Sequence, residues 1–183
     1  MIRPIIILLI FISLLSCKSP EARQPISHKT GSFIDVSIER NIKLNKKESE
    51  KIAQIIKQDT AKAYIASQSG FWYTYDTKVE KDTITADLGD VVNFDYSVKS
   101  LSGQTIYSDD DIKPRDYKMD KQELFTGLRE GLKLMKPGET VTFLFPSQKA
   151  FGYYGDTNRI GVSVPLICKV TVNSITQTQT QTD

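Results

Sequence analysis

The stretch ELFTGLREGLKLMKPG, residues 123–138, predicts a short amphipathic helix that ends in a turn. Its large apolar side chains recur every three to four residues and fall on one stripe of a helix from Lys121 to Lys136. They are Leu124, Leu128, Leu132 and Met135. Pro137-Gly138 ends the helix, because proline cannot continue it and glycine readily adopts the conformation of a helix C-terminus. The stripe requires another element to cover it.

On both sides of this helix, apolar and polar residues alternate with a period of two, which is typical of half-buried strands. Four such segments are readable, at residues 71–75, 92–99, 140–145 and 166–173. Gly103 follows the second segment and predicts a hairpin turn. A twisted antiparallel sheet folded over the single helix would bury the helix stripe and the apolar strand faces together. The predicted fold class is therefore α+β.

Composition excludes several classes of function. The 183 residues include 24 Lys and Arg against 22 Asp and Glu, and a formal charge of +2 gives no strong field for nucleic-acid binding. One histidine, His28, and two cysteines, Cys17 and Cys168, cannot form a Cys/His zinc site. A Ser-His-Asp hydrolase would depend on His28 alone. The two commonest glycine-rich nucleotide-binding loops do not occur.

The N-terminus indicates export and lipidation. Residues 5–15 form an apolar run with the length of a signal-peptide core, too short to span a bilayer comfortably. The sequence LLSC, residues 14–17, resembles the lipobox of bacterial lipoproteins, in which the signal is cut before the cysteine. The resemblance implies that Cys17 becomes the first residue and that its acyl chains anchor the protein in a membrane. A signal anchor with an incidental cysteine is the alternative.

The residue after the lipobox bears on location. In lipoproteins of diderm bacteria an aspartate at this position is associated with retention in the inner membrane, and here the residue is Lys18. The resemblance therefore implies a protein of the cell envelope, lipid-anchored to the outer membrane and facing the periplasm. Cys168 is then the one remaining thiol, so the mature protein has no internal disulfide.

Two segments precede the predicted sheet. Residues 17–44 are interpreted as the lipidated cysteine and a polar tether, in which the alternation of Ile34, Val36 and Ile38 predicts a short strand or extended arm. At residues 45–69 the period becomes helical, from a capping-box start at Asn45 to glycine after Ser69. This helix would pack on its own domain. A helix for client binding or for homodimerisation through residues 45–70 is the alternative.

Five segments, in their order and spacing, resemble the FKBP-type peptidyl-prolyl isomerases. They are GDVVNFDY at 89–96, ELFTGLREGL at 123–132, MKPGE at 135–139, AFG at 150–152 and VPLICKV at 164–170. The resemblance covers about Gly70 to Ile175. With the lipobox and the preceding helix, it is greatest for the gliding-motility-associated FKBP lipoproteins of Bacteroidota-type bacteria. The implied domains are 1–16 signal peptide, 17–44 tether, 45–69 helix, 70–175 isomerase domain and 176–183 disordered tail.

The resemblance implies an FKBP-like sheet over one short helix and an enzyme that isomerises X-Pro bonds in exported polypeptide clients. It implies no cofactor, no metal ion and no nucleic-acid partner. An X-Pro bond loses resonance and carbonyl polarity as it twists, so an apolar, water-poor cavity favours the twisted state over the planar one. An FKBP-fold chaperone or scaffold that holds clients without useful catalysis is the alternative.

Carried over position by position, the resemblance implies an apolar pocket. The catalytic positions are Tyr96, Leu124, Phe125, Leu128 and Phe151. The further substrate-binding positions are Ile106, Tyr107, Ile160 and Cys168. In the family, the backbone N–H at the Phe125 position binds a substrate carbonyl. Four of the nine also lie on stripes that must be buried, so core packing is the alternative for Tyr96, Leu124, Leu128 and Cys168.

Five pocket positions depart from the family pattern. Ile106 and Cys168 stand where the family usually has Phe, and Leu128 stands where Trp is frequent. Phe151 lacks the hydroxyl of the tyrosine often found there. Tyr107 stands where the family usually has Asp, which removes the hydrogen bond from that carboxylate to the hydroxyl of Tyr96. We therefore expect weak binding of macrolide inhibitors.

Overall fold

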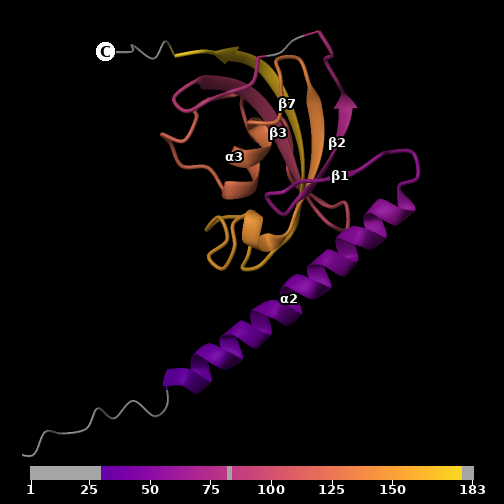
Figure 1. Cartoon of the computed structure of the whole chain (residues 1–183), viewed down its shortest axis with the longest axis vertical. Coiled ribbons are helices and arrows are strands. Elements are labelled where there is room, and N and C mark those ends of the chain that lie inside the picture. The colour runs from indigo at the N-terminus through magenta and orange to yellow at the C-terminus, as the bar shows by residue number, and fades with distance from the viewer. Residues whose placement is uncertain (1–29, 82–83, 179–183) are drawn as a thin grey trace, which may run out of the picture. The chain divides into compact units, whose positions relative to one another are not determined.

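The computed structural model describes residues 30–81 and 84–178, and Figure 1 shows its elements. In chain order they are helix α2 (Thr30–Gln58), strands β1 (Ile65–Ala66), β2 (Trp72–Thr77), β3 (Val91–Ser100), β4 (Thr105–Tyr107) and β5 (Arg115–Lys118), helix α3 (Thr126–Leu132), strand β6 (Thr140–Phe145), the 3-10 helix η1 (Ser147–Lys149) and strand β7 (Leu166–Thr176).

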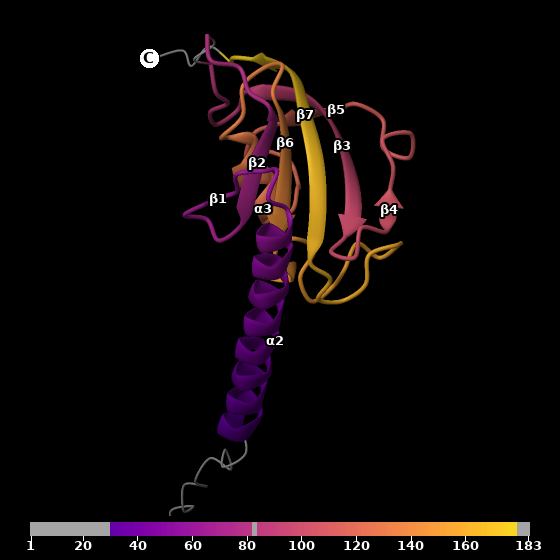
Figure 2. The same ribbon diagram turned by 90° about the vertical axis from the view of Figure 1, so that its right-hand side faces the viewer.

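The strands form one antiparallel sheet in the order β1-β2-β6-β7-β3-β4, with β5 also paired to β3. Figure 2 shows β6, β7 and β3 side by side at its centre. Their registers place Phe143 opposite Cys168 and Cys168 opposite Val98. Figure 1 shows α3 lying within the curve of the sheet. Leu128 and Leu132 of α3 are fully buried there, so the helix stripe and the sheet cover one another.

The α+β fold with an antiparallel sheet around a short helix is confirmed. The four strands read from alternation correspond to β2, β3, β6 and β7. Gly103 turns the chain between β3 and β4 with a φ of 86°, and its N–H donates to the Ser100 carbonyl at 2.9 Å. Strands β1, β4 and β5 were not predicted, because two to four residues are too few to display a period.

The predicted helix at Lys121–Lys136 is too long. Phe125 has extended backbone angles (φ −63°, ψ 144°) and α3 begins only after it. After Leu132, the N–H groups of Leu134 and Met135 donate to carbonyls three residues back, which makes a turn and not another helical turn. Met135 is nevertheless fully buried, so the apolar stripe correctly marked core residues outside the helix.

The N-terminal segments were predicted wrongly. Residues 30–58 form one helix, so the strand at Ile34 to Ile38 and the helix over 45–69 are both corrected. Ile34 and Ile38 are also four residues apart, a spacing that suits a helix face as well as a strand face. Asn45 lies inside α2 and not at its N-cap. The tether before Thr30, with Cys17, lies outside the described residues.

The second half of α2 packs onto the sheet domain through few side chains. Ile52 is fully buried and Glu48 is 3% exposed. Five apolar residues nearer the start of the helix are each more than half exposed: Phe33, Ile34, Val36, Ile38 and Ile42. Within residues 30–81 and 84–178, no helix has the length and apolar content needed to cross a bilayer.

The predicted disordered tail at 176–183 begins too early. Thr176 belongs to β7, where it lies opposite Val91. The Thr178 N–H then donates to the Asp90 carboxylate at 2.7 Å, and its hydroxyl donates to the Gly89 carbonyl at 2.7 Å. Threonine suits a strand, so the polar repeat first continues the sheet.

Candidate active site

Two cavities share Tyr96 and Phe151 in their walls, and the first also reaches Arg129 of α3. The first has a volume of about 670 Å³ and is lined by Tyr96, Arg115, Gln122, Glu123, Leu124, Phe125, Arg129, Ala150, Phe151, Tyr154 and Gly155. The second has a volume of about 410 Å³ and is lined by Tyr96, Val98, Tyr107, Asp111, Ile112, Lys113, Phe151, Asp156 and Ile160.

Aromatic rings form the apolar wall of the first cavity. Phe125, directly before α3, and Phe151, after η1, have ring centroids 4.9 Å apart. Behind them, Phe145 of β6 contacts Phe125 edge to face at 5.5 Å. Tyr96 of β3 packs on buried Phe94 at 5.5 Å. Core rings therefore back Tyr96 and Phe125, and Phe151 packs on Phe125.

The structure brings six of the nine predicted site residues to the cavities. Those lining a cavity are Tyr96, Tyr107, Leu124, Phe125, Phe151 and Ile160. Leu128 and Cys168 are fully buried in the core and line neither cavity. Ile106 is half-buried, packs against the core and also lines neither. Burial raises the pKa of the Cys168 thiol well above its usual range, which leaves it a small apolar core residue.

Tyr107 has a carboxylate partner that the sequence did not reveal. Its hydroxyl donates to the Asp156 Oδ2 atom at 2.5 Å. The other oxygen, Oδ1, accepts from the N–H groups of Asn158 at 2.9 Å and Ile160 at 2.7 Å. Partial burial would raise the pKa of Asp156, but these hydrogen bonds outweigh it and hold the pKa below 3.8. The second cavity therefore has a fixed negative charge in its wall.

Arg159 holds the same loop against β4. Its guanidinium lies 4.8 Å from the ring centroid of Tyr107 and donates to the Ile106 carbonyl at 3.0 Å. It also pairs with the Asp111 carboxylate at 3.1 Å. The rim of the second cavity is therefore crosslinked by polar contacts between segments about 50 residues apart.

Arg115 brings a positive charge to the first cavity. It lies on β5, is half-buried and donates to the Glu123 carbonyl at 3.1 Å. Burial raises the pKa of the Tyr96 hydroxyl, and the charge of Arg115 beside it partly opposes that rise. Within the described part of the chain, Arg115 forms no ion pair. It was missed because a four-residue strand displays no period.

The first cavity has a second cation of a different kind. Arg129 of α3 lies 3.4 Å from Asp120 and 3.6 Å from Glu130, measured from its Nε atom. Lys133 joins the same two carboxylates at 3.0 and 3.1 Å. The charge of Arg129 is thus largely balanced, whereas that of Arg115 remains available to a ligand.

The aromatic wall of the first cavity suits the binding of an apolar group. The walls nearest Phe125 and Phe151 are apolar, and the one described thiol is buried. Across residues 30–81 and 84–178, no cluster of three or more acidic, histidine or cysteine side chains is placed to hold a metal ion. What the walls supply is an apolar surface of aromatic rings bordered by charged side chains of both signs.

Comparisons with known proteins identify the family. The profile of the FKBP-type peptidyl-prolyl cis-trans isomerases matches residues 82–173. A peptidyl-prolyl cis-trans isomerase from Pseudomonas syringae pv. tomato has a similar crystal structure, with a TM-score of 0.59 and 19% identity over 73% of this chain and 94% of that one. That likeness shows a shared fold. A comparison with curated proteins gave no significant match. Because the family profile spans 92 of the 183 residues, the chain belongs to the FKBP-type peptidyl-prolyl cis-trans isomerases.

Proposed function

We propose that the two cavities sharing Tyr96 and Phe151 are where this enzyme isomerises X-Pro bonds of polypeptide clients. The observation that carries the proposal is the contact between the Phe125 and Phe151 rings at 4.9 Å, because it joins the start of α3 to the loop after η1 in one apolar wall. A proline ring is apolar and fits such a wall. The polar groups at the rim leave room for the flanking peptide.

The chemistry follows from the peptide bond itself. Rotation about an X-Pro bond crosses a barrier of about 18–20 kcal/mol, because the planar form is stabilised by resonance. The twisted form has a less polar carbonyl and loses less on leaving water, so an apolar site binds it better than the planar form. Each tenfold acceleration requires about 1.4 kcal/mol of this preference.

Phe151→Ala tests the site directly. Removing one ring of the wall should lower kcat/KM about tenfold, or 1.4 kcal/mol, in a protease-free assay on short peptides with Phe or Leu before proline. Tyr153→Ala is the matched control, because Tyr153 lies two residues away, is 64% exposed and lines neither cavity. Equal activity in wild type and Phe151→Ala would contradict the proposal.

We also propose that the enzyme acts in the cell envelope, on exported proteins, as a lipoprotein of the gliding-motility-associated kind. The support is the LLSC sequence at 14–17 with Lys18 after it, together with a helix ahead of the isomerase domain. Cys17→Ser should leave the precursor uncleaved or release the protein from membranes. A mutant that fractionates with outer membranes at the mature mass would contradict lipidation.

A second candidate function is the binding of clients without useful catalysis. It is favoured by the exposed apolar residues of α2, since residues such as Ile38 and Ile42 offer a surface for unfolded segments or for a second copy of the chain. Ile42→Glu should then abolish suppression of client aggregation, or dissociate a homodimer in sedimentation, while peptide isomerisation is unchanged. If Ile42→Glu alters neither aggregation nor sedimentation, this candidate fails.

A further inference from the structure

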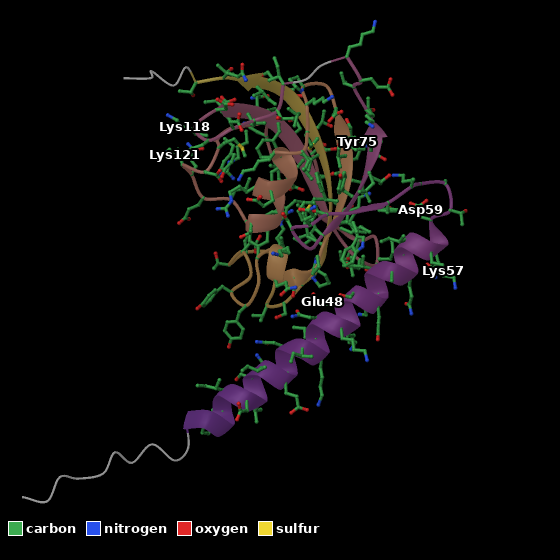
Figure 3. The ribbon with its side chains drawn as sticks, in the orientation of Figure 1. Glu48, Lys57, Asp59, Tyr75, Lys118 and Lys121 are labelled. Carbon is green, nitrogen blue, oxygen red and sulfur yellow. The ribbon has the colours of Figure 1, made fainter. Side chains whose placement is uncertain are left out.

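A buried carboxylate of the N-terminal helix is bonded to the start of η1. Glu48 of α2 is 3% exposed, and Figure 3 labels it on α2. Its Oε2 atom accepts from the Ser147 N–H at 2.8 Å, and its Oε1 atom accepts from the Ser147 hydroxyl at 2.8 Å. Both donors belong to one residue, so the contact fixes its position and orientation.

Ser147 in turn holds both sides of Phe151. Its carbonyl accepts from the N–H of Ala150 at 3.1 Å and from the N–H of Gly152 at 2.9 Å. Phe151 lies between these two residues, and its ring lies in the walls of both cavities. A chain of hydrogen bonds therefore runs from the helix to the backbone on each side of the aromatic wall.

Stability alone does not call for an acid at this position. An ionised carboxylate is costly to bury, and within the described residues Glu48 has no ion pair to offset that cost. An apolar side chain would fill the space at lower cost but would leave the Ser147 N–H unsatisfied. What the carboxylate adds is two directed bonds to one residue.

We propose that Glu48 is a positioning residue of the isomerase, which holds Phe151 in the wall through Ser147. The inference rests on the proposed location of the active site. It makes α2 a support of that site as well as a link to the N-terminus. Asn45, one turn earlier, adds an exposed contact from its Nδ2 atom to the Gln148 Oε1 atom at 3.4 Å.

Three substitutions separate geometry from charge. Glu48→Gln keeps the length of the side chain and can accept from the Ser147 N–H while donating to its hydroxyl oxygen, so kcat/KM should stay within about twofold. Glu48→Asp keeps the charge but is one methylene too short, and kcat/KM should fall about fivefold. Glu48→Ala should cause a similar or larger fall. Equal activity of all three variants and wild type would overturn the inference.

Ile52→Ala controls for stability. Ile52 lies one turn further along α2 and is fully buried, but no hydrogen bond joins its side chain to η1. This variant should lower the melting temperature without changing kcat/KM per folded molecule. If Ile52→Ala reduces kcat/KM as much as Glu48→Ala at a matched melting temperature, Glu48 has only a structural role.

A double-mutant cycle tests the route through Phe151. In the Phe151→Ala background, Glu48→Ala should cost less than twofold, because the ring that it positions is already absent. Additive losses would show that Glu48 acts by another route. If Glu48→Ala does not fold, Ser147→Ala replaces it in the cycle, with an expected two- to threefold loss. Loss of activity in Phe151→Ala but not in Glu48→Ala would contradict this inference alone. Wild-type activity in Phe151→Ala would contradict the proposed site.

Discussion

Gly127→Ala should destabilise the protein although alanine favours helices. Gly127 lies in the first turn of α3 and is buried. A Cβ atom added there would lie 2.6 Å from the Lys149 carbonyl oxygen and 2.6 Å from the Phe145 Cδ1 atom, closer than such atoms pack. Glycine is therefore required by the close approach of α3 to η1 and β6.

The net effect of Gly127→Ala on the free energy of unfolding is the difference between two contributions. Replacing glycine by alanine within a helix gains up to about 1 kcal/mol. Overpacking a well-filled interior costs about 1–3 kcal/mol, and the upper end applies because a backbone carbonyl cannot rotate aside as the end of a side chain can. We expect a net loss of about 1–2 kcal/mol, which lowers the melting temperature by roughly 3–8 °C.

Activity should fall as well. If α3 moves away from η1, the Phe125 and Phe151 rings, now 4.9 Å apart, separate, and kcat/KM should drop about tenfold. Denaturant unfolding and peptide isomerisation measure the two effects. Thr126→Ala, at an exposed position of the same helix, should change stability by less than about 0.5 kcal/mol. A Gly127→Ala protein that is more stable than wild type and equally active would refute the packing argument.

Three further results are expected. Leu132→Ala, at the buried last residue of α3, should cost about 2–5 kcal/mol of stability by leaving a cavity, while the folded fraction isomerises peptides normally. Hydrogen bonds lower the pKa of Asp156 in the folded state, so the stability that they supply is present at neutral pH and is lost as pH falls through the folded-state pKa. The melting temperature of Asp156→Asn should therefore fall less than that of wild type from about pH 5 downwards, and identical pH profiles would contradict this assignment. Because Arg115 forms no ion pair within the described residues, peptides with Glu before proline should react about threefold faster than those with Gln, a preference that Arg115→Leu and high salt should both remove.

How far the sequence predicted the fold depended on the length of each element. Strands β3 and β7 have ten and eleven residues and show clear alternation, because one face of each lies on the core. Strand β1 has two residues and is defined by its pairing with β2. A two-residue strand forms only when its partner strand is in place, so the local sequence pattern does not predict it.

For the candidate site, the apolar wall was predicted and its polar rim was not. Phe125 and Phe151 came from the resemblance, and both line the first cavity. Replacement of the family's aspartate by Tyr107 predicts that the Tyr96 hydroxyl loses a partner, and it says nothing about the hydroxyl that Tyr107 itself brings. The Tyr107 hydroxyl bonds Asp156, 49 residues later in a loop. Loop carboxylates show no periodicity, so their partners emerge only when the chain has folded.

Leu128 shows the opposite limit. It shares its stripe with Leu124, and both are equally apolar, yet Leu124 lines the first cavity while Leu128 is fully buried. The difference arises because α3 begins at Thr126, so that Leu128 lies on the helix and Leu124 lies in the loop before it. The extended backbone of Phe125 sets the start of α3, and the apolar period does not reveal backbone conformation.

Glu48 lies four residues before Ile52, so on one helix both side chains share a face. If Ile52 marks the face that packs on the domain, an acid one turn away on that face must also be covered, and a covered carboxylate requires donors. Glu50, two residues further on, points elsewhere and is exposed. The spacing therefore separates a structural acid from a solvated one before any partner is known, provided that the helix begins at residue 30. In a helix that began at Asn45, Glu48 would instead be assigned to the capping box and given a partner at the helix N-terminus. The partner itself, 99 residues away, follows only from the fold. Since the Ser147 backbone holds the Phe151 loop, an error about where the helix starts hides a contact between α2 and the candidate site.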